Sequence, residues 1–515
     1  MELPAAEWVP CNFQMDNWTM EPAIWAPGFP VEYHQYASSE IFGSCLQTCD
    51  PNPNGGRLVE YAQATWNYPT TVAVAQELDV DMEANMQDNT ICAFKETVQE
   101  FKVDMDTMRM KIHRYPASLR GFNEYSSVPR MVAMGPYHCA RVLQDQLIKH
   151  VEKVKYVAAY HCVMESGHSL QEVYDAVVSA AHIARHRYDN NLMAGIGDGD
   201  FLPMMFYDAC FLVQYMLWCT PAATEMEASL RSFFDFNRKV LRHDLMLLEN
   251  QLPWLVVEAV MRFRHVELVD FIADWRDYLQ DRKVLEEKPV VLDESYEPLH
   301  LLGLLRFYIV GRSKTKVQTR ANLNSISVSV SAIELAEIGI TLTAKETTEL
   351  INMGISKKGI LSAKLSLAPL SLDDERASFL INMAALELCT TSNFQEAGDE
   401  DSAVCSYLLL LSMLVHREED VQELRTKHLL QGGAGLINKD ALDFFTSLQS
   451  LPLRGLCYVR VMVEIENYKV KRWIRIMVHA FLYKNKKTIL TALSVISVLV
   501  SILGTLMSLK SKSKI

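Results

Sequence analysis

An uncharged run of 22 residues near the C-terminal end constrains this chain more than any other feature. Residues 488–509 read TILTALSVISVLVSILGTLMSL and lie between two groups of lysines. At about 1.5 Å per residue, a helix of this length spans roughly 33 Å, enough to cross the hydrocarbon core of a bilayer. The alternative is a buried core helix, but such a helix seldom ends a chain between lysine clusters. We therefore predict a single C-terminal transmembrane helix at 488–509.

The bases around this run predict its orientation. Three bases follow it and six precede it, the preceding set being Lys471, Arg472, Arg475, Lys484, Lys486 and Lys487. The positive-inside rule then predicts a tail-anchored, single-pass protein with a cytoplasmic body, in the plasma membrane or an endomembrane. The basic segment 469–487 would lie at the cytoplasmic leaflet, where it could attract anionic lipid. The alternative for these bases is topology determination without lipid selectivity.

Charge divides the rest of the chain. The formal net charge is -13, and residues 1–100 alone contain two bases against fifteen acids, whereas residues 469–515 contain ten bases and no acid. This pattern predicts five segments: an acidic N-terminal arm at 1–120, irregular and then one helix; a helical domain at 121–468; a basic juxtamembrane segment at 469–487; the transmembrane helix at 488–509; and a short basic tail at 510–515.

Composition excludes several classes of protein. A mean hydropathy of +0.01 with 22% charged residues rules out a disordered chain, a fibre and a multi-span transporter. Bases in the body are interspersed with acids, which disfavours nucleic-acid binding. The first basic residue is Arg57, so a secretory signal is not supported. Eleven scattered cysteines are typical of reduced thiols in the cytosol.

Hydrophobic periodicity predicts a mainly α fold, a multi-helix globular body with a small β insertion near 325–368. A polar helix is expected at 80–113, after an irregular stretch at 1–70. The expected strands cover 325–330, 338–343 and 359–367, and helices resume from Asp373. The expected helices of the body cover 141–163, 169–187, 201–219, 224–250, 253–281 and 299–310.

Motifs for chemistry are weak throughout. We predict no metal site and no cofactor, because no zinc ligand set, phosphate loop or nucleophile elbow is complete. Five side chains could form an enzyme site on paper: Asp208, His243, Asp244, Glu249 and His300. The segment 243–254, HDLMLLENQLPW, is the most unusual in the body. It predicts the end of one helix and the start of another, with the Asn or Gln side chain capping backbone N–H groups.

Several short blocks of the sequence resemble the motifs of a known family. Residues 131–138 (MVAMGPYH), 201–211 (FLPMMFYDACF) and 247–254 (LLENQLPW) resemble, in order, the motifs of the plant domain-of-unknown-function 247 family. Later blocks near His300, 331–339, 405–407 and 419–421 follow in the same order, and the resemblance covers roughly 127–510. It implies no catalytic residues. The family signature, without an assigned role, comprises Gly135, Pro136, Tyr137, His138, Asp208, Cys210, Phe211, Glu249, Asn250, Gln251, Pro253 and His300.

The leading hypothesis is a membrane-tethered plant protein that acts by recognising an unidentified protein partner. Some grass members of the family resemble self-incompatibility determinants, so reproductive recognition is the specific variant that the resemblance implies. Two alternatives stay open at this point. The first is an enzyme with an unrecognised polar site between helices, and the second is a soluble helical scaffold whose final helix folds back onto the body.

Overall fold

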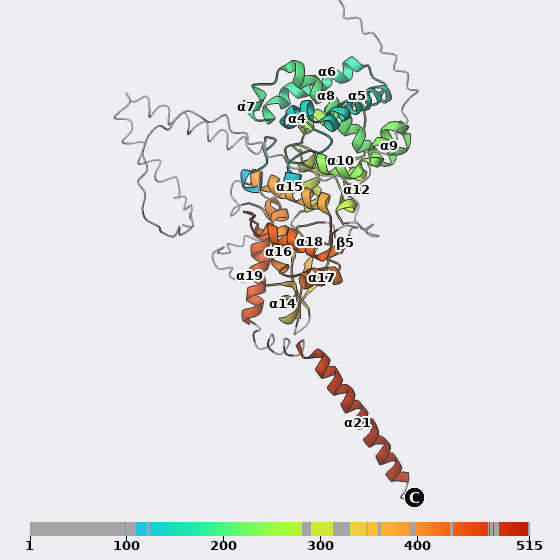
Figure 1. The fold of residues 1–515 in the computed structure, drawn as a ribbon, viewed down its shortest axis with the longest axis vertical. Helices are drawn as coiled ribbons and strands as arrows, with labels where there is room; N and C mark the ends of the chain where they lie inside the picture. The colour runs from blue at the N-terminus through green and yellow to red at the C-terminus, as the bar shows by residue number, and fades with distance from the viewer. Residues whose placement is uncertain are drawn as a thin grey trace, which may run out of the picture. The chain divides into compact units, whose positions relative to one another are not determined.

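The computed structural model describes residue 98 and residues 110–512, except 121–123, 281–289, 313–329, 348, 359–361, 392–396, 433–435 and most of 472–483. Contacts divide the chain into residues 1–86 and 87–515, so everything described belongs to the second unit. The described part is mainly helical, as predicted, and contains two small sheets (Figure 1). The expected irregular stretch at 1–70 and most of the expected helix at 80–113 lie outside the described residues.

The helices begin where capping residues allow it. Ser169 caps α6 through a reciprocal pair of hydrogen bonds with Glu172, and Asp145 caps α5. The helices are α3 (Ala117–Arg120), η3 (Glu124–Ser126), η4 (Pro136–His138), α4 (Cys139–Gln144), α5 (Gln146–Ser166), α6 (Leu170–Ala184), η5 (Arg185–Arg187), α7 (Asn190–Met193), α8 (Asp198–Trp218), η6 (Pro221–Glu225), α9 (Ala228–Phe236), α10 (Arg238–Leu245), α11 (Trp254–Met261), α12 (Leu268–Gln280), α13 (Leu301–Val310), α14 (Ala332–Glu337), α15 (Asp374–Thr390), η8 (Asp399–Ser402), α16 (Ala403–Leu414), α17 (Glu418–Thr426), α18 (Asn438–Leu448), α19 (Leu456–Lys471) and α21 (Lys486–Lys512).

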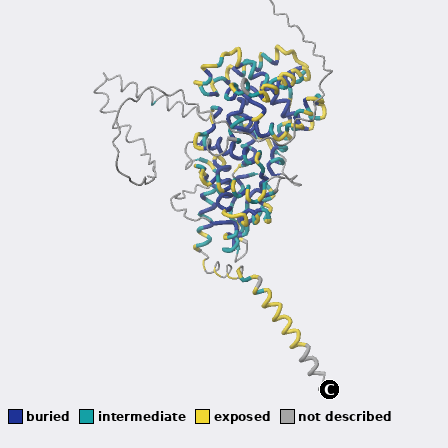
Figure 2. The backbone as a smooth tube through the Cα atoms, viewed as in Figure 1, coloured by how far each residue is buried: buried dark blue, intermediate teal, exposed yellow. Residues whose placement is uncertain are grey.

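Helix α8 is the central helix of the N-terminal half of the body. It packs against α5, α6 and α11 and is buried along most of its length (Figure 2). Among the described residues, α8 is the one helix long and apolar enough to cross a membrane by length and composition, but 78% of its apolar window is buried inside the protein. A helix that is hydrophobic all round and enclosed by others is a core helix.

Two small sheets contain the strands. In the first, β3 (Ser362–Leu367) lies between β1 (Ile340–Ala344), to which it is parallel, and β2 (Gly354–Lys358), to which it is antiparallel. Alternate side chains of β3 are buried, as the two-residue period of a strand requires. In the second sheet, β4 (Leu370–Leu372) pairs in parallel with β5 (Leu430–Gly432). The insertion near 325–368 is thus confirmed at 340–367, whereas the strand expected at 325–330 lies almost wholly outside the described residues.

Several predicted boundaries are wrong. The single helix expected at 224–250 is two helices, α9 and α10, because the Asn237 side chain donates to the Phe233 carbonyl at 2.8 Å and competes with the backbone. The helix expected at 253–281 is interrupted at 262–267, a mostly polar stretch between α11 and α12. Residues 110–116 form a turn and irregular chain rather than the end of a helix, and the prediction missed α14, β2, β4 and β5.

The final helix, α21, contains 27 residues, whereas the run predicted to cross a membrane has 22. Its described apolar stretch, Thr488–Gly504, counts among the shorter apolar helices, so the transmembrane helix predicted at 488–509 is not confirmed. Every residue from 491 to 504 is exposed (Figure 2).

Candidate functional site

The Asp244 carboxylate organises the backbone that leads into the first signature block. Asp244 lies in the last turn of α10 and is fully buried. Its two oxygens accept hydrogen bonds from the backbone N–H groups of Arg130, Met131 and Val132, at 2.9, 2.7 and 2.8 Å. This segment has no strand partner, so a side chain more than 110 residues away satisfies the donors that a sheet would otherwise pair.

His243 completes this arrangement. Its Nδ1 lies 2.8 Å from the Asp244 carboxylate and its Nε2 lies 2.7 Å from the Tyr125 carbonyl. The His243 ring therefore bridges the Asp244 carboxylate and the Tyr125 carbonyl, and so joins α10 to η3.

A second buried ion pair lies between α5 and α8. Lys155 Nζ lies 2.7 Å from Asp208, 2.6 Å from Glu152 and 2.5 Å from the Ala133 carbonyl, which it donates to. Burial lowers the pKa of Lys155, but the Asp208 and Glu152 carboxylates more than compensate and hold that pKa above its usual value. The other Asp208 oxygen accepts from the Gly135 backbone N–H at 2.8 Å.

Gly135 occupies a position that only glycine suits. Its φ is +67°, in the left-handed region. A Cβ placed there would lie 2.9 Å from the Tyr188 hydroxyl and 3.1 Å from the Gln251 carbonyl oxygen. The glycine therefore permits both the turn and the close approach of the 247–251 loop.

Contrary to the prediction, Asn250 and Gln251 do not cap the start of α11, because no described side chain accepts from the first N–H groups of that helix; both bind more distant backbone instead. Asn250 accepts from the Met134 N–H at 2.6 Å and donates to the carbonyls of Val132 and Asp244, each at 2.8 Å. These contacts satisfy backbone groups of the 132–134 segment and of the last turn of α10. The predicted break between two helices is confirmed, since α10 ends at Leu245 and α11 begins at Trp254.

Gln251 makes the same kind of contacts toward α13. It accepts from the Leu302 N–H at 2.9 Å and donates to the carbonyls of Leu245 and Leu247, each at 2.8 Å. The Gln251 side chain therefore satisfies backbone groups at and just after the end of α10 and at the start of α13.

Glu249 and Pro253, in the same loop, and His300, before α13, also contact backbone or stand at the start of a helix. Glu249 accepts from the Tyr115 N–H at 2.7 Å, and Pro253 precedes the first turn of α11. His300 caps α13, its Nδ1 accepting from the Gly303 N–H at 3.2 Å.

Signature residues 136–138 form η4 and pack around the chain entering at 110–115. Pro136 starts this turn, and the Tyr137 hydroxyl donates to the Ile112 carbonyl at 2.7 Å and accepts from the Asp189 N–H at 3.1 Å. His138 is buried.

Cys210 and Phe211 belong to the apolar core. Phe211 packs edge-on against Phe234, with ring centroids 5.5 Å apart. Burial raises the pKa of the Cys210 thiol well above its usual value, so this cysteine is protonated and a poor nucleophile. All seven cysteines in the described chain are free thiols.

We call Lys155, Asp208, His243, Asp244, Asn250, Gln251 and Asn382 the buried polar network. The enzyme alternative required Asp208, Asp244, Glu249 and His300 to face a pocket. Instead, the three carboxylates accept backbone N–H groups, His300 caps a helix, and the space beside Asn250 and Gln251 holds no room for a ligand. The geometry gives these side chains a structural role.

Two members of the buried polar network, Asn382 and Lys155, were not predicted as site residues. Asn382 accepts from the Leu248 N–H and donates to the carbonyls of Ser126 and Ser378, each at 2.8 Å. Lys155 had a detectable signal: it shares the helical face of apolar residues such as Val151. A lone lysine on an apolar face requires a buried acidic partner.

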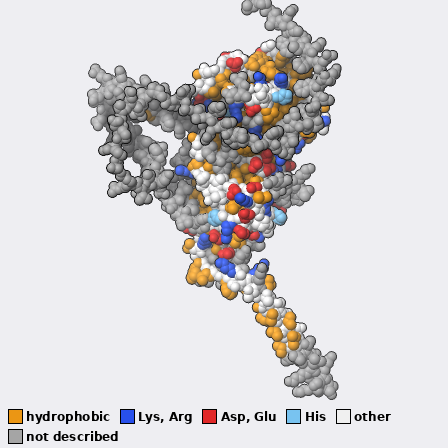
Figure 3. All heavy atoms as spheres, viewed as in Figure 1, with side chains coloured by type: hydrophobic (Ala, Val, Ile, Leu, Met, Phe, Trp, Pro, Cys, Tyr) orange, Lys and Arg blue, Asp and Glu red, His pale blue; other side chains and the backbone are white. Residues whose placement is uncertain are grey.

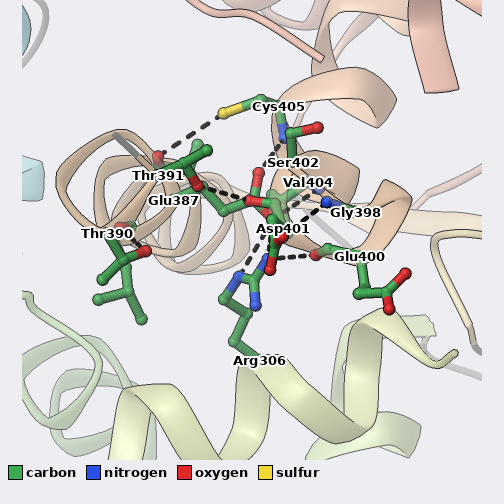
Figure 4. Close-up of polar contacts among 12 residues, drawn as sticks. Arg306, Glu387, Thr390, Thr391, Gly398, Glu400, Asp401, Ser402, Val404 and Cys405 are labelled. Carbon is green, nitrogen blue, oxygen red and sulfur yellow. Dashed lines mark hydrogen bonds and ion pairs between the residues drawn. The ribbon is translucent and has the colours of Figure 1, made fainter. Parts of the chain in front are cut away.

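A separate buried ion pair joins α13 to α15. Figure 4 shows Arg306 reaching the fully buried Glu387 carboxylate, at 2.7 Å from Nη2, and also donating to the Glu400 carbonyl at 2.5 Å. Glu387 further accepts from the N–H groups of Val404 and Cys405, at 2.9 and 2.8 Å. Burial raises the pKa of Glu387, although Arg306 opposes the shift. This contact fixes the first turn of α16 against α15.

A cavity of about 700 Å³ lies where η3, α15 and α18 meet. Acidic side chains line much of it, but two of them have local roles. Asp373 caps α15, and Asp440 accepts from the Ile437 N–H at the start of α18. No group of three or more His, Cys, Asp or Glu side chains in the described chain has an arrangement that could hold a metal ion.

Three buried histidines predict a pH dependence of stability. Burial lowers the pKa of His113 and His138 to about 4, and that of His300 to about 3. His138 is therefore neutral at pH 7, and its 4.0 Å contact with Glu249 is not an ion pair. In the unfolded chain these three histidines bind protons near pH 6.5, where they are still neutral in the folded chain. Acidification therefore favours the unfolded chain. We expect each histidine to remove about 1.4 kcal/mol of stability per pH unit between pH 6.5 and about 4.

Urea unfolding of the full chain in detergent at several pH values measures this slope. His300→Gln is expected to reduce it, whereas His265→Gln, at a side chain that is 78% exposed, should leave it unchanged. An equal slope in both variants would contradict the assignment.

Comparison with known proteins places these motifs in a family. The family model described as a plant protein of unknown function, DUF247, matches residues 112–500, a span that includes all twelve signature residues. The Arabidopsis thaliana protein called UPF0481 protein At3g47200 is 22% identical over 419 residues, which cover 77% of this chain and 84% of that protein. No solved structure matches. The resemblance predicted from the ordered blocks is confirmed, and the chain belongs to the plant DUF247 family.

Proposed function

We propose that this chain is a membrane-tethered protein that acts by recognising a protein partner. The helical body supplies the recognition surface and α21 is the tether. A tether raises the effective concentration of the body at the membrane, so modest affinities for a membrane-associated partner suffice.

The observation that carries the proposal is the exposure of α21. Its apolar side chains from Leu490 to Leu503 are 50–63% exposed, and they point to every side of the helix. A helix that is apolar all round is stable only inside a protein or inside a bilayer. Because α21 is not buried, the bilayer is the environment that suits it, and the folded-back helix of a soluble scaffold does not fit this exposure.

The bases before α21 support the orientation of the proposed anchor. Lys484 and Lys486 precede the apolar stretch, and the segment 469–487 contains no acid. The positive-inside rule then favours a cytoplasmic body, with the basic segment beside anionic lipid. Reproductive recognition is the specific variant of this function, and it rests on the family resemblance alone.

Deletion of residues 488–515 tests the tether. We expect the full chain to stay in the membrane pellet after a carbonate wash, and the truncated chain to move to the supernatant, because only insertion into the hydrocarbon core survives that wash. A matched control replaces Lys510 and Lys512 by Gln and should stay in the pellet. A truncated chain that still sediments, or a full chain that is monomeric without detergent, would contradict the anchor.

A further inference from the structure

The outward face of α5 presents a row of apolar side chains to solvent. Four of its side chains are large, apolar and exposed: Tyr156 (52%), Val157 (40%), Tyr160 (60%) and Met164 (62%). At 100° per residue they project to the same side of the helix, opposite the buried Val151 and Cys162. Exposed apolar side chains such as Ile183 on α6 stand singly, but a comparable row, Val470, Trp473, Met477 and Phe481, begins at the end of α19 and continues into the basic segment before α21. The outward face of a surface helix is normally polar, so this stripe calls for an explanation.

Bases continue the same face toward the N-terminal end of α5. Lys149 and Lys153 are exposed and project to the same side as Tyr156 and Tyr160. Figure 3 shows hydrophobic and charged side chains together at the end of the body that contains α5, α6 and α8. We call Lys149, Lys153, Tyr156, Val157, Tyr160 and Met164 the α5 face.

The acids of α5 are already engaged. Glu152 lies 2.6 Å from the buried Lys155, and Glu165 lies 2.6 Å from Arg264. The α5 face therefore presents hydrogen-bond donors and positive charge, from two ammonium groups and two phenol hydroxyls, around an apolar centre. A complementary surface must supply carboxylates around an apolar stripe of its own.

The tyrosines suit a binding surface. Tyr156 packs edge-on against Tyr207 of α8, with ring centroids 4.3 Å apart, so its ring is held in place before any partner arrives. Tyrosine and methionine are enriched at protein interfaces because they combine large apolar area with adaptable packing. From Lys149 to Met164 the face is about 22 Å long, which matches four turns of a partner helix.

We propose that the α5 face binds an acidic amphipathic helix of a partner protein. This inference rests on the proposed function and deepens it, because it names the surface and the class of partner. The partner helix lies along α5, with its apolar stripe on Tyr156, Val157 and Tyr160 and its carboxylates toward Lys149 and Lys153.

A designed peptide tests the chemistry directly. The probe is a fluorescein-labelled 18-residue helix with leucines on one face and glutamates flanking them, and the control peptide has lysine in place of every glutamate. With full-length protein in nanodiscs, fluorescence anisotropy should show binding of the acidic peptide and at least tenfold weaker binding of the basic one. Equal binding of the two peptides would overturn the proposal.

Variants locate the binding on α5. Tyr160→Ser and Lys153→Glu are each expected to weaken binding of the acidic peptide about tenfold, as loss of an anchor residue does. Ile183→Ser, at an exposed apolar residue of α6, is the matched control and should not change binding. Both positions are exposed, so the variants are expected to fold. Binding that is insensitive to both α5 variants would overturn the proposal.

Crosslinking from the full-length protein in its own tissue separates this inference from the proposed function. A photoreactive residue at position 160 should capture an acidic helical segment of another protein, whereas capture of lipid or of a basic segment would overturn the α5 proposal. Capture of proteins only from positions elsewhere on the body would also overturn it and leave protein recognition standing. No captured protein from any position would contradict both.

Discussion

Asp244→Asn is expected to destabilise the folded chain by about 3–5 kcal/mol, the usual cost of breaking a buried charged pair by changing one partner. The carboxylate accepts three backbone N–H groups and contacts His243. An amide of the same shape has only one acceptor oxygen, so its NH₂ group would face hydrogen-bond donors. The fully buried His243 ring would also lose the carboxylate that its Nδ1 contacts at 2.8 Å.

Urea unfolding of the full chain in detergent, followed by tryptophan fluorescence, measures this loss. Glu267→Gln is the matched control, because the Glu267 side chain is 67% exposed and contacts only the exposed His265. It should change the free energy of unfolding by less than about 0.5 kcal/mol. If both variants had the same stability, Asp244 would not have the role that its hydrogen bonds indicate.

Lys155→Met is the second substitution with a large expected effect on the free energy of unfolding. It removes the cation that lies 2.7 Å from the buried Asp208 carboxylate and leaves that charge uncompensated, so we expect a loss of about 3–5 kcal/mol. The double variant Lys155→Met with Asp208→Asn should regain at least about 1 kcal/mol, because the asparagine is neutral and can still accept from Gly135.

The same urea unfolding measurement tests the contribution of the Lys155–Asp208 ion pair. Lys153→Met, at an exposed position of the same helix, is the control. We expect that control to lie close to the unsubstituted chain, since it removes no buried contact. A double variant that is no more stable than Lys155→Met alone would show that the charge of Asp208 is not what makes the single substitution costly.

Local signals in the sequence predicted much of the fold. Apolar residues at helical spacing located α5, α6, α8 and α13 within a few residues. The polar Glu249, Asn250 and Gln251 between two apolar stretches, followed by Pro253, predicted the break between α10 and α11. These features depend on neighbours in the chain, which is why they can be predicted from it.

What the sequence could not predict depends on distant partners. That Asn250 accepts from Met134, 116 residues away, follows from packing and not from any local pattern. Strand β5 has three residues and exists because β4 lies beside it. The partners of Asp208 and Asp244 were equally invisible, so the carboxylates could be read as catalytic groups until their backbone contacts were known.

The hydrogen bonds of residues 130–134 have a consequence for synthesis on the ribosome. This stretch emerges more than 100 residues before Asp244 and Asn250, the side chains that accept from the N–H groups of residues 130–132 and 134. At 5–20 residues per second, it waits for roughly 5–25 s with those groups bonded to water. During that time the nascent chain is open at this point to proteases and chaperones. The early part of the domain thus acquires its native backbone contacts only after residue 250 has left the exit tunnel.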